Sequence, residues 1–421
     1  MRLLHTSDWH LGQHFFGKSR QPEHQAFLDW LIEQVSEHQV DLVLVAGDIF
    51  DTASPPSYAR EMYNRFIVAL QSTGAQLVVV GGNHDSVAML QESKALLACL
   101  NTHVLPGLAQ PEEHLLLVPD RDGKPGLLLC ALPFMRAREL ITSQAGEDAK
   151  DKQQSLGVAI RDKYQQIWQL ALARREALRL EGREGLDLPI IASGHLTVMG
   201  AAMTESVREI YIGTLDALPA DAFPPVDYLA LGHIHKPQQI AGQSHLRYCG
   251  SPIPLSFDET KQEKEVLLVE FDATSLQQIS PLKVPRWRPM VSVKGDLEQI
   301  AGQLLEAAAQ GTVDCPVWAE VTIRADSYLN DLQERIQSIT QGLPLEVLRI
   351  RRERNQAASG LAEQMKETLA ELTPEEVFIR RLEQEELDDE QRQALLLMHR
   401  QLLEQIAHEQ ISVHSSGEQQ A

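Results

Sequence analysis

Five short polar segments of the sequence carry side chains that could bind metal ions. Each contains Asp, Asn or His beside Gly or Ser, and each follows a short apolar run. The segments are Ser7–His10, Gly47–Asp51, Gly81–Asp85, Ser193–Leu196 and Gly232–Lys236. Their candidate ligands are Asp8, His10, Asp48, Asn83, His195, His233 and His235. In Asp-x-His and His-x-His, alternate side chains of an extended chain point to the same side, so each pair offers two ligands to one site.

These ligand types indicate which ions the segments would bind. Carboxylate and amide oxygens combined with imidazole nitrogens favour Mn²⁺, Fe²⁺ or Zn²⁺ over soft Cu(I). Seven ligands are too many for one tetrahedral ion, and they suit two ions about 3.5–4 Å apart that share a carboxylate. Taken alone, each segment also has a structural explanation, since Gly-Asn-His-Asp is a turn sequence and His195 could be a core histidine. The joint pattern favours a metal centre.

The segments follow runs that predict buried strands. Runs of four to six apolar residues that end in polar residues or Gly are typical of such strands. They cover Arg2–His5, Leu42–Ala46, Leu77–Val80, Leu127–Ala131, Ile190–Ala192 and Tyr228–Leu231. Amphipathic helices are predicted at Glu23–Glu37, Tyr58–Ser72 and Gln165–Leu180, and a hairpin turn at Asp120–Gly126. The alternation predicts an α/β fold, in which ligands gather at the carboxyl ends of the strands.

The sequence predicts three domains. Residues 1–280 would form the α/β domain, and the prolines at 281, 285 and 289 mark the start of a small α+β module at 281–351. The module reads strand, helix, strand, helix, strand: Met290–Lys294, Leu297–Ala309, Val317–Ile323, Leu329–Thr340 and Leu345–Ile350. Residues 352–421 read as a helical tail, with 15 acidic and 6 basic residues from Glu353 onward. Such acidic amphipathic helices suit a partner surface, although they could also fold back on their own domain.

Composition restricts the mode of substrate binding. The chain has 421 residues, with 38 Lys and Arg against 59 Asp and Glu, a net charge of −21. Its mean field repels phosphates, so any contact with nucleic acid must be local, bridged by metal ions or shared with a basic partner. The four Cys have no CxxC spacing, which argues against a zinc knuckle. No run approaches the roughly 18 apolar residues of a membrane span, and His5 and Asp8 interrupt the N-terminus too early for a signal peptide.

The set of segments resembles the calcineurin-like metallophosphoesterase superfamily over roughly the first 240 residues. Further residues are similar to those of the nuclease subunits of MRN-type break-repair complexes. They are Ser7-Asp8-Trp9-His10-Leu11-Gly12, Ala46-Gly47-Asp48, Tyr211-Ile212-Gly213-Thr214 and Tyr248-Cys249-Gly250-Ser251-Pro252. This resemblance covers nearly the whole chain and is weakest after Gly360. It implies a β-sandwich flanked by helices, followed by an α+β capping domain that binds DNA and a helical C-terminal tail.

The resemblance also implies roles for single residues. One ion would bind Asp8, His10, Asp48 and His235, and the other Asp48, Asn83, His195 and His233, so that Asp48 bridges. His84 would be the catalytic histidine that is not a ligand. Many archaeal and eukaryotic relatives have His three residues after the bridging Asp. Here that position is Asp51, so this role is not transferred. Whether Asp85 shapes its turn or orients His84 stays open.

The implied function is a two-metal DNA phosphodiesterase. Hydroxide activated by the ions would attack the phosphodiester, and His84 would assist the leaving group. The resemblance implies an ATP-dependent 3′–5′ double-strand exonuclease and single-strand or hairpin endonuclease, acting in DNA repair, recombination and replication. The expected ions are Mn²⁺, with Fe²⁺ or Mg²⁺ as alternatives, and no nucleotide is expected on this chain itself. The alternatives are another binuclear phosphoesterase, such as a phosphatase or cyclic-nucleotide phosphodiesterase, and a non-catalytic protein that tethers DNA.

Partners and DNA contacts complete the expectations. By resemblance, the C-terminal helices bind an SMC-like ATPase, two copies of the chain pair within a heterotetramer, and the substrates are DNA ends and hairpins. The expected location is the cytoplasm, at the nucleoid. The basic residues Arg349, Arg351 and Arg352 follow the last strand of the small module and are candidate DNA contacts. A solvated face would explain the same cluster.

Overall fold

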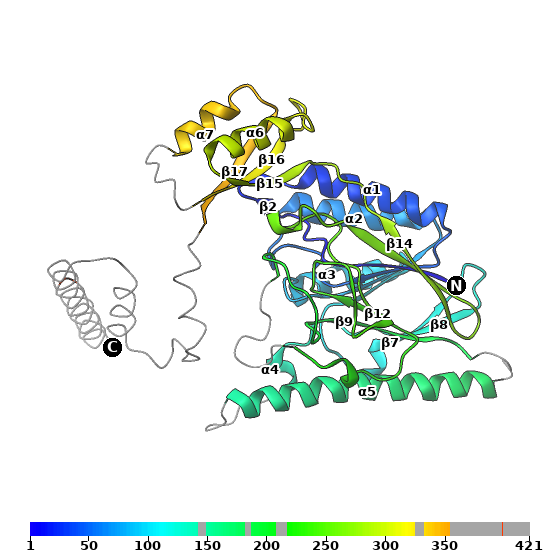
Figure 1. The fold of residues 1–421 in the computed structure, drawn as a ribbon. Coiled ribbons are helices and arrows are strands. Elements are labelled where there is room, and N and C mark those ends of the chain that lie inside the picture. The colour runs from blue at the N-terminus through cyan, green and yellow to red at the C-terminus, as the bar shows by residue number, and fades with distance from the viewer. Residues whose placement is uncertain (142–148, 182–186, 208–216, 325–331, 354–397, 399–421) are drawn as a thin grey trace, which may run out of the picture. The chain divides into compact units, whose positions relative to one another are not determined.

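The structure is a computed structural model that describes residues 1–141, 149–181, 187–207, 217–324, 332–353 and 398 (Figure 1). The chain divides into two compact units, Met1–Thr322 with Asp331–Arg351, and Ile323–Asn330 with Arg352–Ala421. The strands and helices below lie in the first unit, except for the last residue of β16 and of β17. The predicted helical tail lies almost wholly outside the described residues.

The first large sheet has six strands in the order β14-β13-β1-β4-β5-β6. The strands are β1 (Arg2–Thr6), β4 (Leu42–Ala46), β5 (Gln76–Val80), β6 (Thr102–Leu105), β13 (Glu265–Phe271) and β14 (Leu276–Lys283). The four strands β1, β4, β5 and β6 are parallel, and β13 joins β1 in antiparallel register. Three of the predicted strands therefore lie side by side, with their carboxyl ends at one edge.

The second large sheet has the order β11-β12-β10-β9-β8-β7. Its strands are β7 (Leu115–Pro119), β8 (Pro125–Cys130), β9 (Ile190–His195), β10 (Tyr228–Gly232), β11 (Gln238–Ile240) and β12 (Gln243–Tyr248). The strands β8, β9, β10 and β12 are parallel, and β7 and β11 pair antiparallel at the two edges. The predicted hairpin is confirmed, because β7 and β8 flank residues 120–124.

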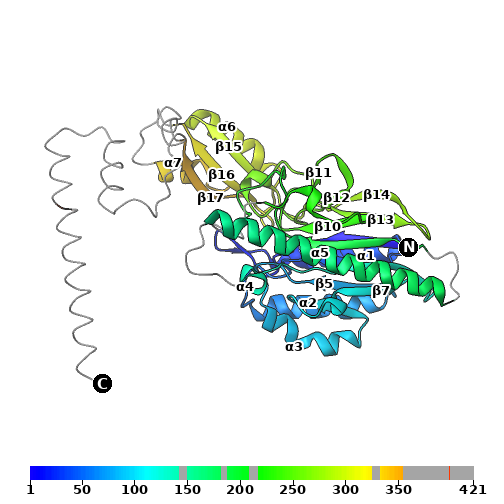
Figure 2. The ribbon, with the colours of Figure 1, turned by 90° about the horizontal axis from the view of Figure 1, so that it is seen from below.

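Helices cover the outer faces of the two sheets. They are α1 (Gln21–Glu37), α2 (Ser57–Gln71), α3 (Val87–Ala98), α4 (Ala137–Leu140) and α5 (Ala149–Leu180), with short 3₁₀ turns at Pro111–His114, Ala220–Ala222 and Phe257–Glu259. Figure 1 shows α1 and α2 on one side of the sheets and α5 on the opposite side, and in Figure 2, seen from below, α5 lies in front of the sheets. The predicted α/β fold is confirmed in the form of a sandwich.

Alternating side chains of the strands build the layers of the core. In β4, Leu42 and Leu44 join the apolar cluster between the sheets, whereas Val43 and Val45 join the cluster under α1, α2 and α3. Both faces of this strand are buried, which explains why its sequence is continuously apolar. A third cluster lies between the second sheet and α5.

One helix extends beyond its predicted limits, and the strand β14 was not predicted. Helix α5 begins at Ala149 rather than Gln165, and its buried Leu156, Ile160 and Tyr164 are spaced four residues apart. Strand β14 continues through Pro281, which pairs with Leu267. Because β14 is an edge strand, a residue without an N–H group is tolerated there.

The small module has the five elements that the sequence predicts. They are β15 (Met290–Gly295), α6 (Leu297–Ala308), β16 (Val317–Ile323), α7 (Leu332–Thr340) and β17 (Leu345–Arg352), with the sheet order β15-β16-β17. Asp296 caps α6, since its side chain accepts a hydrogen bond from the Gln299 N–H group. Trp318 of β16 stacks on Phe15 of a short hairpin, β2 (His14–Phe15) and β3 (Lys18–Ser19), at a centroid distance of 5.7 Å.

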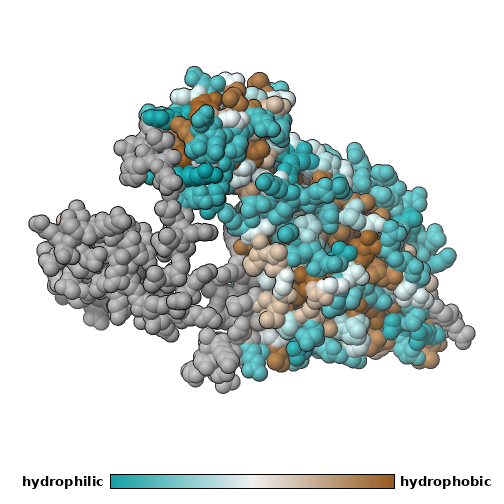
Figure 3. Space-filling model, in the orientation of Figure 1, coloured by the Kyte–Doolittle hydropathy of each residue, from teal (hydrophilic) through white to brown (hydrophobic). Residues whose placement is uncertain are grey.

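Because most apolar side chains lie in the core clusters, few of them are left for the surface of the described residues. The face in Figure 3 is mainly hydrophilic, with small hydrophobic areas between the polar ones. Among the described helices, none is both long and apolar enough to cross a bilayer.

Candidate metal centre

The predicted ligands all lie at the carboxyl ends of parallel strands. Strands β1, β4 and β5 of the first sheet lead to Asp8 and His10, to Asp48, and to Asn83 and His84. In the second sheet, His195 ends β9, and His233 and His235 follow β10. Every one of them except Asn83 and His84 is at most 3% exposed. The two sheets therefore bring residues from distant parts of the sequence to one buried location.

Asp48 lies at the middle of this cluster. Its Oδ2 atom is 3.3 Å from His195 Nε2, 3.6 Å from His10 Nε2 and 4.0 Å from His84 Nε2. Its Oδ1 atom accepts a hydrogen bond from the His84 backbone N–H group at 2.9 Å. A carboxylate surrounded by imidazoles from three other loops is placed as a bridging ligand would be.

The candidate ligands form three overlapping groups, in each of which the ligand atoms lie within 4.8 Å of one another. The groups are Asp8, His10 and His235; Asp48, His195 and His233; and His10, Asp48 and His84. Asn83 belongs with the second group, because its Oδ1 atom lies 2.9 Å from His195 Nε2 and 3.2 Å from His233 Nδ1. The first two groups follow the two predicted ligand sets, and the binding role of each side chain stays a prediction.

The chemistry of the donor set fits divalent cations. Within the described residues, the buried Nε2 atoms of His10 and His233 have no hydrogen-bond partner, and an unsatisfied buried polar atom costs about 1–3 kcal/mol. His195 Nδ1 must donate to the Ala46 carbonyl oxygen, 2.9 Å away, so the Nε2 atom of a neutral ring is an acceptor. That acceptor faces the Asn83 oxygen. Two acceptors in contact require a proton or a cation between them.

Electrostatics keep Asp48 ionised despite its burial. Burial alone would disfavour the carboxylate, but His195, followed by His10 and His84, holds the pKa of Asp48 well below its usual range. For His195, burial acts against the charged ring, yet Asp48 raises its pKa to about 9. The cluster therefore holds a negative charge at its centre, which is where a bridging ligand needs one.

The backbone around the ligands is unusual. Asp8, His10, Asp48 and His233 all have positive φ, at 53°, 48°, 51° and 94°. Such conformations cost about 1–3 kcal/mol each and gather at functional sites. The adjacent glycines are required by close approach, since a Cβ atom at Gly82 would lie 2.2 Å from Asp48 Oδ1. A glycine next to Asp, Asn or His after a predicted strand is therefore a feature by which such candidate ligands can be recognised in the sequence.

Asp51 orients two histidines, a role that the sequence did not show. Its Oδ1 atom is 3.1 Å from His10 Nδ1, and its backbone carbonyl accepts a hydrogen bond from His84 Nδ1 at 2.6 Å. Both rings therefore present Nε2 toward Asp48. A carboxylate or carbonyl on the far nitrogen of a ligand histidine is a common way to fix the tautomer that binds metal.

Asp85 holds the turns together rather than contacting the His84 ring. Its carboxylate accepts hydrogen bonds from the backbone N–H groups of Ile49, Phe50 and Gly82 at 3.2, 3.0 and 2.8 Å. Burial, and then the nearby Asp48 charge, raises the pKa of Asp85 to about 6. The contacts answer the question left open by the sequence, because they tie the loop after β4 to the loop after β5.

The candidate DNA contacts have acidic neighbours. Arg349 lies 3.2 Å from both Glu205 and Glu320, and Arg351 lies 2.9 Å from Glu205. Arg352 is exposed at the end of β17. The basic character of this cluster is thus partly neutralised within the protein.

Comparisons with known proteins agree with the geometry. The family model for calcineurin-like phosphoesterases matches residues 1–237, and the one for the type 5 capsule protein repressor C-terminal domain matches residues 286–386. The chain is 54% identical over 395 residues to the SbcD subunit of the nuclease SbcCD of Escherichia coli (strain K12), covering 94% of this chain and 96% of that protein. Identity to the proteins of the same name is 32% in Rhodobacter capsulatus, covering 90% of this chain and 93% of the relative, and 31% in Bacillus subtilis, covering 78% and 81%.

The match to the calcineurin-like phosphoesterases agrees with the observed sandwich, in which loops at the strand ends carry the candidate ligands. Calcineurin-like phosphoesterases use divalent metals, and this chain has candidate ligands for them at the expected edge of the sandwich. The chain belongs to the family of the SbcD subunits of SbcCD nucleases, within the calcineurin-like phosphoesterases, and is a metal-dependent hydrolase of the nuclease type.

Proposed function

We propose that the protein is a two-metal DNA phosphodiesterase that works as the nuclease subunit of an SbcCD complex. Its activities would be ATP-dependent 3′–5′ exonuclease cleavage of double strands and endonuclease cleavage of single strands and hairpins, in repair, recombination and replication. The observation that carries the proposal is the buried cluster of carboxylate, amide and imidazole side chains around Asp48. The names of the relatives support a nuclease.

The proposed ligand sets follow the first two groups in the structure. Asp8, His10, Asp48 and His235 would bind one ion, and Asp48, Asn83, His195 and His233 the other. Oxygen and imidazole ligands suit Mn²⁺, with Fe²⁺ or Mg²⁺ as alternatives. When bound, the two ions supply an activated water as nucleophile and neutralise charge on the phosphate.

His84 is the proposed proton donor to the leaving group. Its Nδ1–H group is held by the Asp51 carbonyl, so Nε2 is the atom that carries the transferable proton. The side chain is 7% exposed, and its Nε2 atom lies 4.0 Å from Asp48 Oδ2, in the group that it forms with His10 and Asp48. General acid catalysis of this kind contributes about 10²–10⁴-fold to the rate.

We propose that the partner is SbcC, an SMC-like ATPase, and that residues 352–421 bind it. The relatives are named as one subunit of a nuclease called SbcCD, and this supports a complex with a second protein. The proposed domains are the nuclease domain 1–280, the capping module 281–351 and this C-terminal region. Such a protein would act in the cytoplasm, at the nucleoid. DNA phosphates would meet Arg349, Arg351 and Arg352 by displacing Glu205 from its ion pairs.

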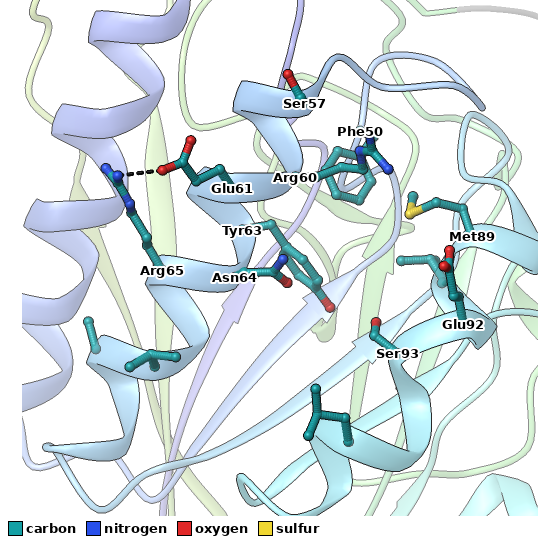
Figure 4. Close-up of a pocket in the computed structure, with 14 residues that line it drawn as sticks. Phe50, Ser57, Arg60, Glu61, Tyr63, Asn64, Arg65, Met89, Glu92 and Ser93 are labelled. Atoms are coloured by element: carbon teal, nitrogen blue, oxygen red, sulfur yellow. Dashed lines mark hydrogen bonds and ion pairs between the residues drawn. The ribbon is translucent and has the colours of Figure 1, made fainter.

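A homodimer within the complex is proposed to form through α2 and α3. These helices line a groove of about 970 Å³, part of which Figure 4 shows with Arg60 and Tyr63 of α2 and with Met89 and Glu92 of α3. Two apolar side chains in the groove are well exposed, Val68 at 63% and Leu96 at 69%. A second copy of the same surface would bury these side chains.

The test is the substitution His84→Gln in the full chain, assayed on linear and hairpin DNA with Mn²⁺, alone and with SbcC and ATP. The variant is expected to bind Mn²⁺ and DNA as the unchanged protein does and to lose cleavage by at least about 10²-fold. Cleavage at the unchanged rate would refute the role of His84. Hydrolysis of phosphate monoesters or cyclic nucleotides without any DNA cleavage would indicate another phosphoesterase.

A further inference from the structure

A buried hydrogen-bond network contacts the Nδ1 atom of His235. Its centre is Glu259, which is 0% exposed. The Glu259 carboxylate accepts hydrogen bonds from Lys264 Nζ at 2.6 Å, the Leu255 N–H group at 3.0 Å, Thr204 Oγ1 at 3.0 Å, Ser256 Oγ at 3.1 Å, Ser251 Oγ at 3.4 Å and Ser206 Oγ. Apart from Ser251, these residues belong to none of the motifs found in the sequence.

Ser206 connects this network to His235. Its Oγ atom lies 2.6 Å from His235 Nδ1 and also forms a hydrogen bond with Glu259. The direct distance from His235 Nδ1 to Glu259 Oε1 is 3.6 Å, which is too long for a good hydrogen bond. The hydroxyl therefore bridges the ring and the carboxylate.

The direction of these hydrogen bonds fixes the tautomer of His235. An ionised carboxylate can only accept, so Ser206 donates its proton to Glu259 and accepts with its lone pairs. His235 Nδ1 must then carry the proton that Ser206 accepts. Nε2 is left as a lone pair on the ring, which belongs to the ligand group with Asp8 and His10.

The backbone of His235 is fixed by the same network. Its carbonyl oxygen accepts hydrogen bonds from Lys264 Nζ at 2.9 Å and from the Ser251 N–H group at 3.1 Å. Lys264 thus contacts both the backbone of His235 and the carboxylate that holds Ser206. The His235 ring is held at Nδ1 and its main chain at the carbonyl oxygen. The orientation of the ring and the position of the backbone that carries it are therefore both fixed.

The segment that bears Ser206 is also held from the small module. The neighbouring Glu205 forms ion pairs with Arg349 and Arg351 of β17, and its backbone N–H group donates to Asp258 at 3.1 Å. These contacts restrict the position of the main chain beside Ser206. A hydroxyl on a restrained segment loses little freedom when it orients a ring.

We propose that Ser206, backed by the Glu259–Lys264 pair, is the positioning residue for His235 and sets the affinity of the ion site that contains Asp8 and His10. The inference rests on the proposed metal centre. Replacing a group that orients a ligand histidine typically weakens metal binding by about 10–100-fold. The other proposed site, with Asn83, His195 and His233, does not contact Ser206 in the described residues and should keep its affinity.

The experiment is a Mn²⁺ titration of the metal-free full chain, with free Mn²⁺ followed by electron paramagnetic resonance. Ser206→Ala is compared with Ser206→Thr, which keeps the hydroxyl. The matched control is Ser256→Ala, because Ser256 Oγ lies 3.1 Å from the same Glu259 oxygen, beside its shorter hydrogen bond to Asp258. No contact joins Ser256 to His235 in the described part of the chain. Thermal unfolding of each metal-free variant reports separately on folding.

Ser206→Ala is expected to bind one of the two ions about 10-fold or more weakly, while Ser206→Thr and Ser256→Ala bind both as the unchanged protein does. Two unchanged affinities in Ser206→Ala would overturn the proposal. Equal weakening in Ser256→Ala, or failure of Thr to restore binding, would also overturn it, since the Ser206 hydroxyl would then not be the cause. If the unchanged protein bound two ions but did not cleave DNA, the nuclease proposal would be refuted and the proposal for Ser206 would not be affected.

Discussion

Replacing Lys264 with Met should destabilise the protein strongly, because it leaves a buried charge without its counter-ion. Lys264 is 5% exposed, and its Nζ atom lies 2.6 Å from Glu259 Oε2. Burial lowers the pKa of Lys264 while Glu259 raises it. Burial also opposes ionisation of Glu259, but Lys264 above all holds the pKa of that carboxyl well below its usual range. Each charge is maintained by the other.

The expected loss in the free energy of unfolding depends on which hydrogen-bond donors remain around Glu259 in Lys264→Met. Removing one partner of a buried ion pair costs about 3–5 kcal/mol. Glu259 would keep the hydroxyl donors Ser206, Thr204 and Ser256 and the Leu255 N–H group. These donors compensate part of the lost interaction, so we expect a value near the lower end, about 3 kcal/mol.

The assay is urea unfolding of the metal-free protein at neutral pH, followed by circular dichroism. The double variant Glu259→Gln with Lys264→Met removes both charges, and its loss should fall at least about 2 kcal/mol short of the sum of the two single losses. The control is Lys283→Met, whose ion pair with Glu263 at 2.8 Å is exposed and should contribute less than about 1 kcal/mol. If Lys264→Met were no more destabilising than this control, the argument from burial would be refuted.

Two further outcomes follow from the buried histidines. Burial lowers the pKa of His5 to about 3, so the folded chain keeps this ring neutral while the unfolded chain protonates it below about pH 6.5. The contribution of His5 to the free energy of unfolding should be constant above that pH. It should fall by about 1.4 kcal/mol per pH unit as the pH drops toward 3. In urea titrations at a series of pH values, the free energy of unfolding of His5→Gln should therefore fall less steeply than that of the unchanged protein. Mn²⁺ at about a hundred times its dissociation constant should stabilise the chain by about 2.7 kcal/mol for each ion bound, because the ions bind the folded chain and not the unfolded one. In the folded chain they would satisfy the buried Nε2 atoms of His10 and His233. An unchanged thermal midpoint with Mn²⁺, or a stabilisation that excess EDTA fails to reverse, would contradict this coupling.

The convergence of the candidate ligands could be predicted from the sequence because its signals are local. Each candidate ligand stands within a few residues of a strand end, and Asp48, Asn83, His195 and His233 each directly follow a glycine that the close packing requires. The strands themselves are buried on both faces, so their sequences are continuous apolar runs that a reader can recognise. Once the strands are parallel, their carboxyl ends must meet, and the convergence of Asp8, Asp48 and Asn83 follows.

The parts that the sequence did not predict depend on contacts between distant segments. Asp51 looks like an ordinary loop residue until its distance to His10 is known. Ser206 and Glu259 are 53 positions apart and share no motif. The first half of α5 was missed because Gly157 and many charged residues lie in it, although tertiary packing of Leu156 overrides their low helix propensity. Likewise, nothing local shows that Glu205 pairs with Arg349 and Arg351.

The physical problem of this fold is the concentration of polar groups in its interior. Four of the proposed ligand residues have positive φ, and within the described residues the buried Nε2 atoms of His10 and His233 lack hydrogen-bond partners. The cluster on its own therefore reduces stability. Two divalent ions in the proposed centre would bring four positive charges against the negative charges of Asp8 and Asp48, and thereby both satisfy these groups and create local positive charge. This local charge explains how a chain of net charge −21 could bind a phosphodiester. Residues such as Asp51 and Ser206 then matter because they fix ring orientation before the ions bind, which lowers the entropic cost of binding.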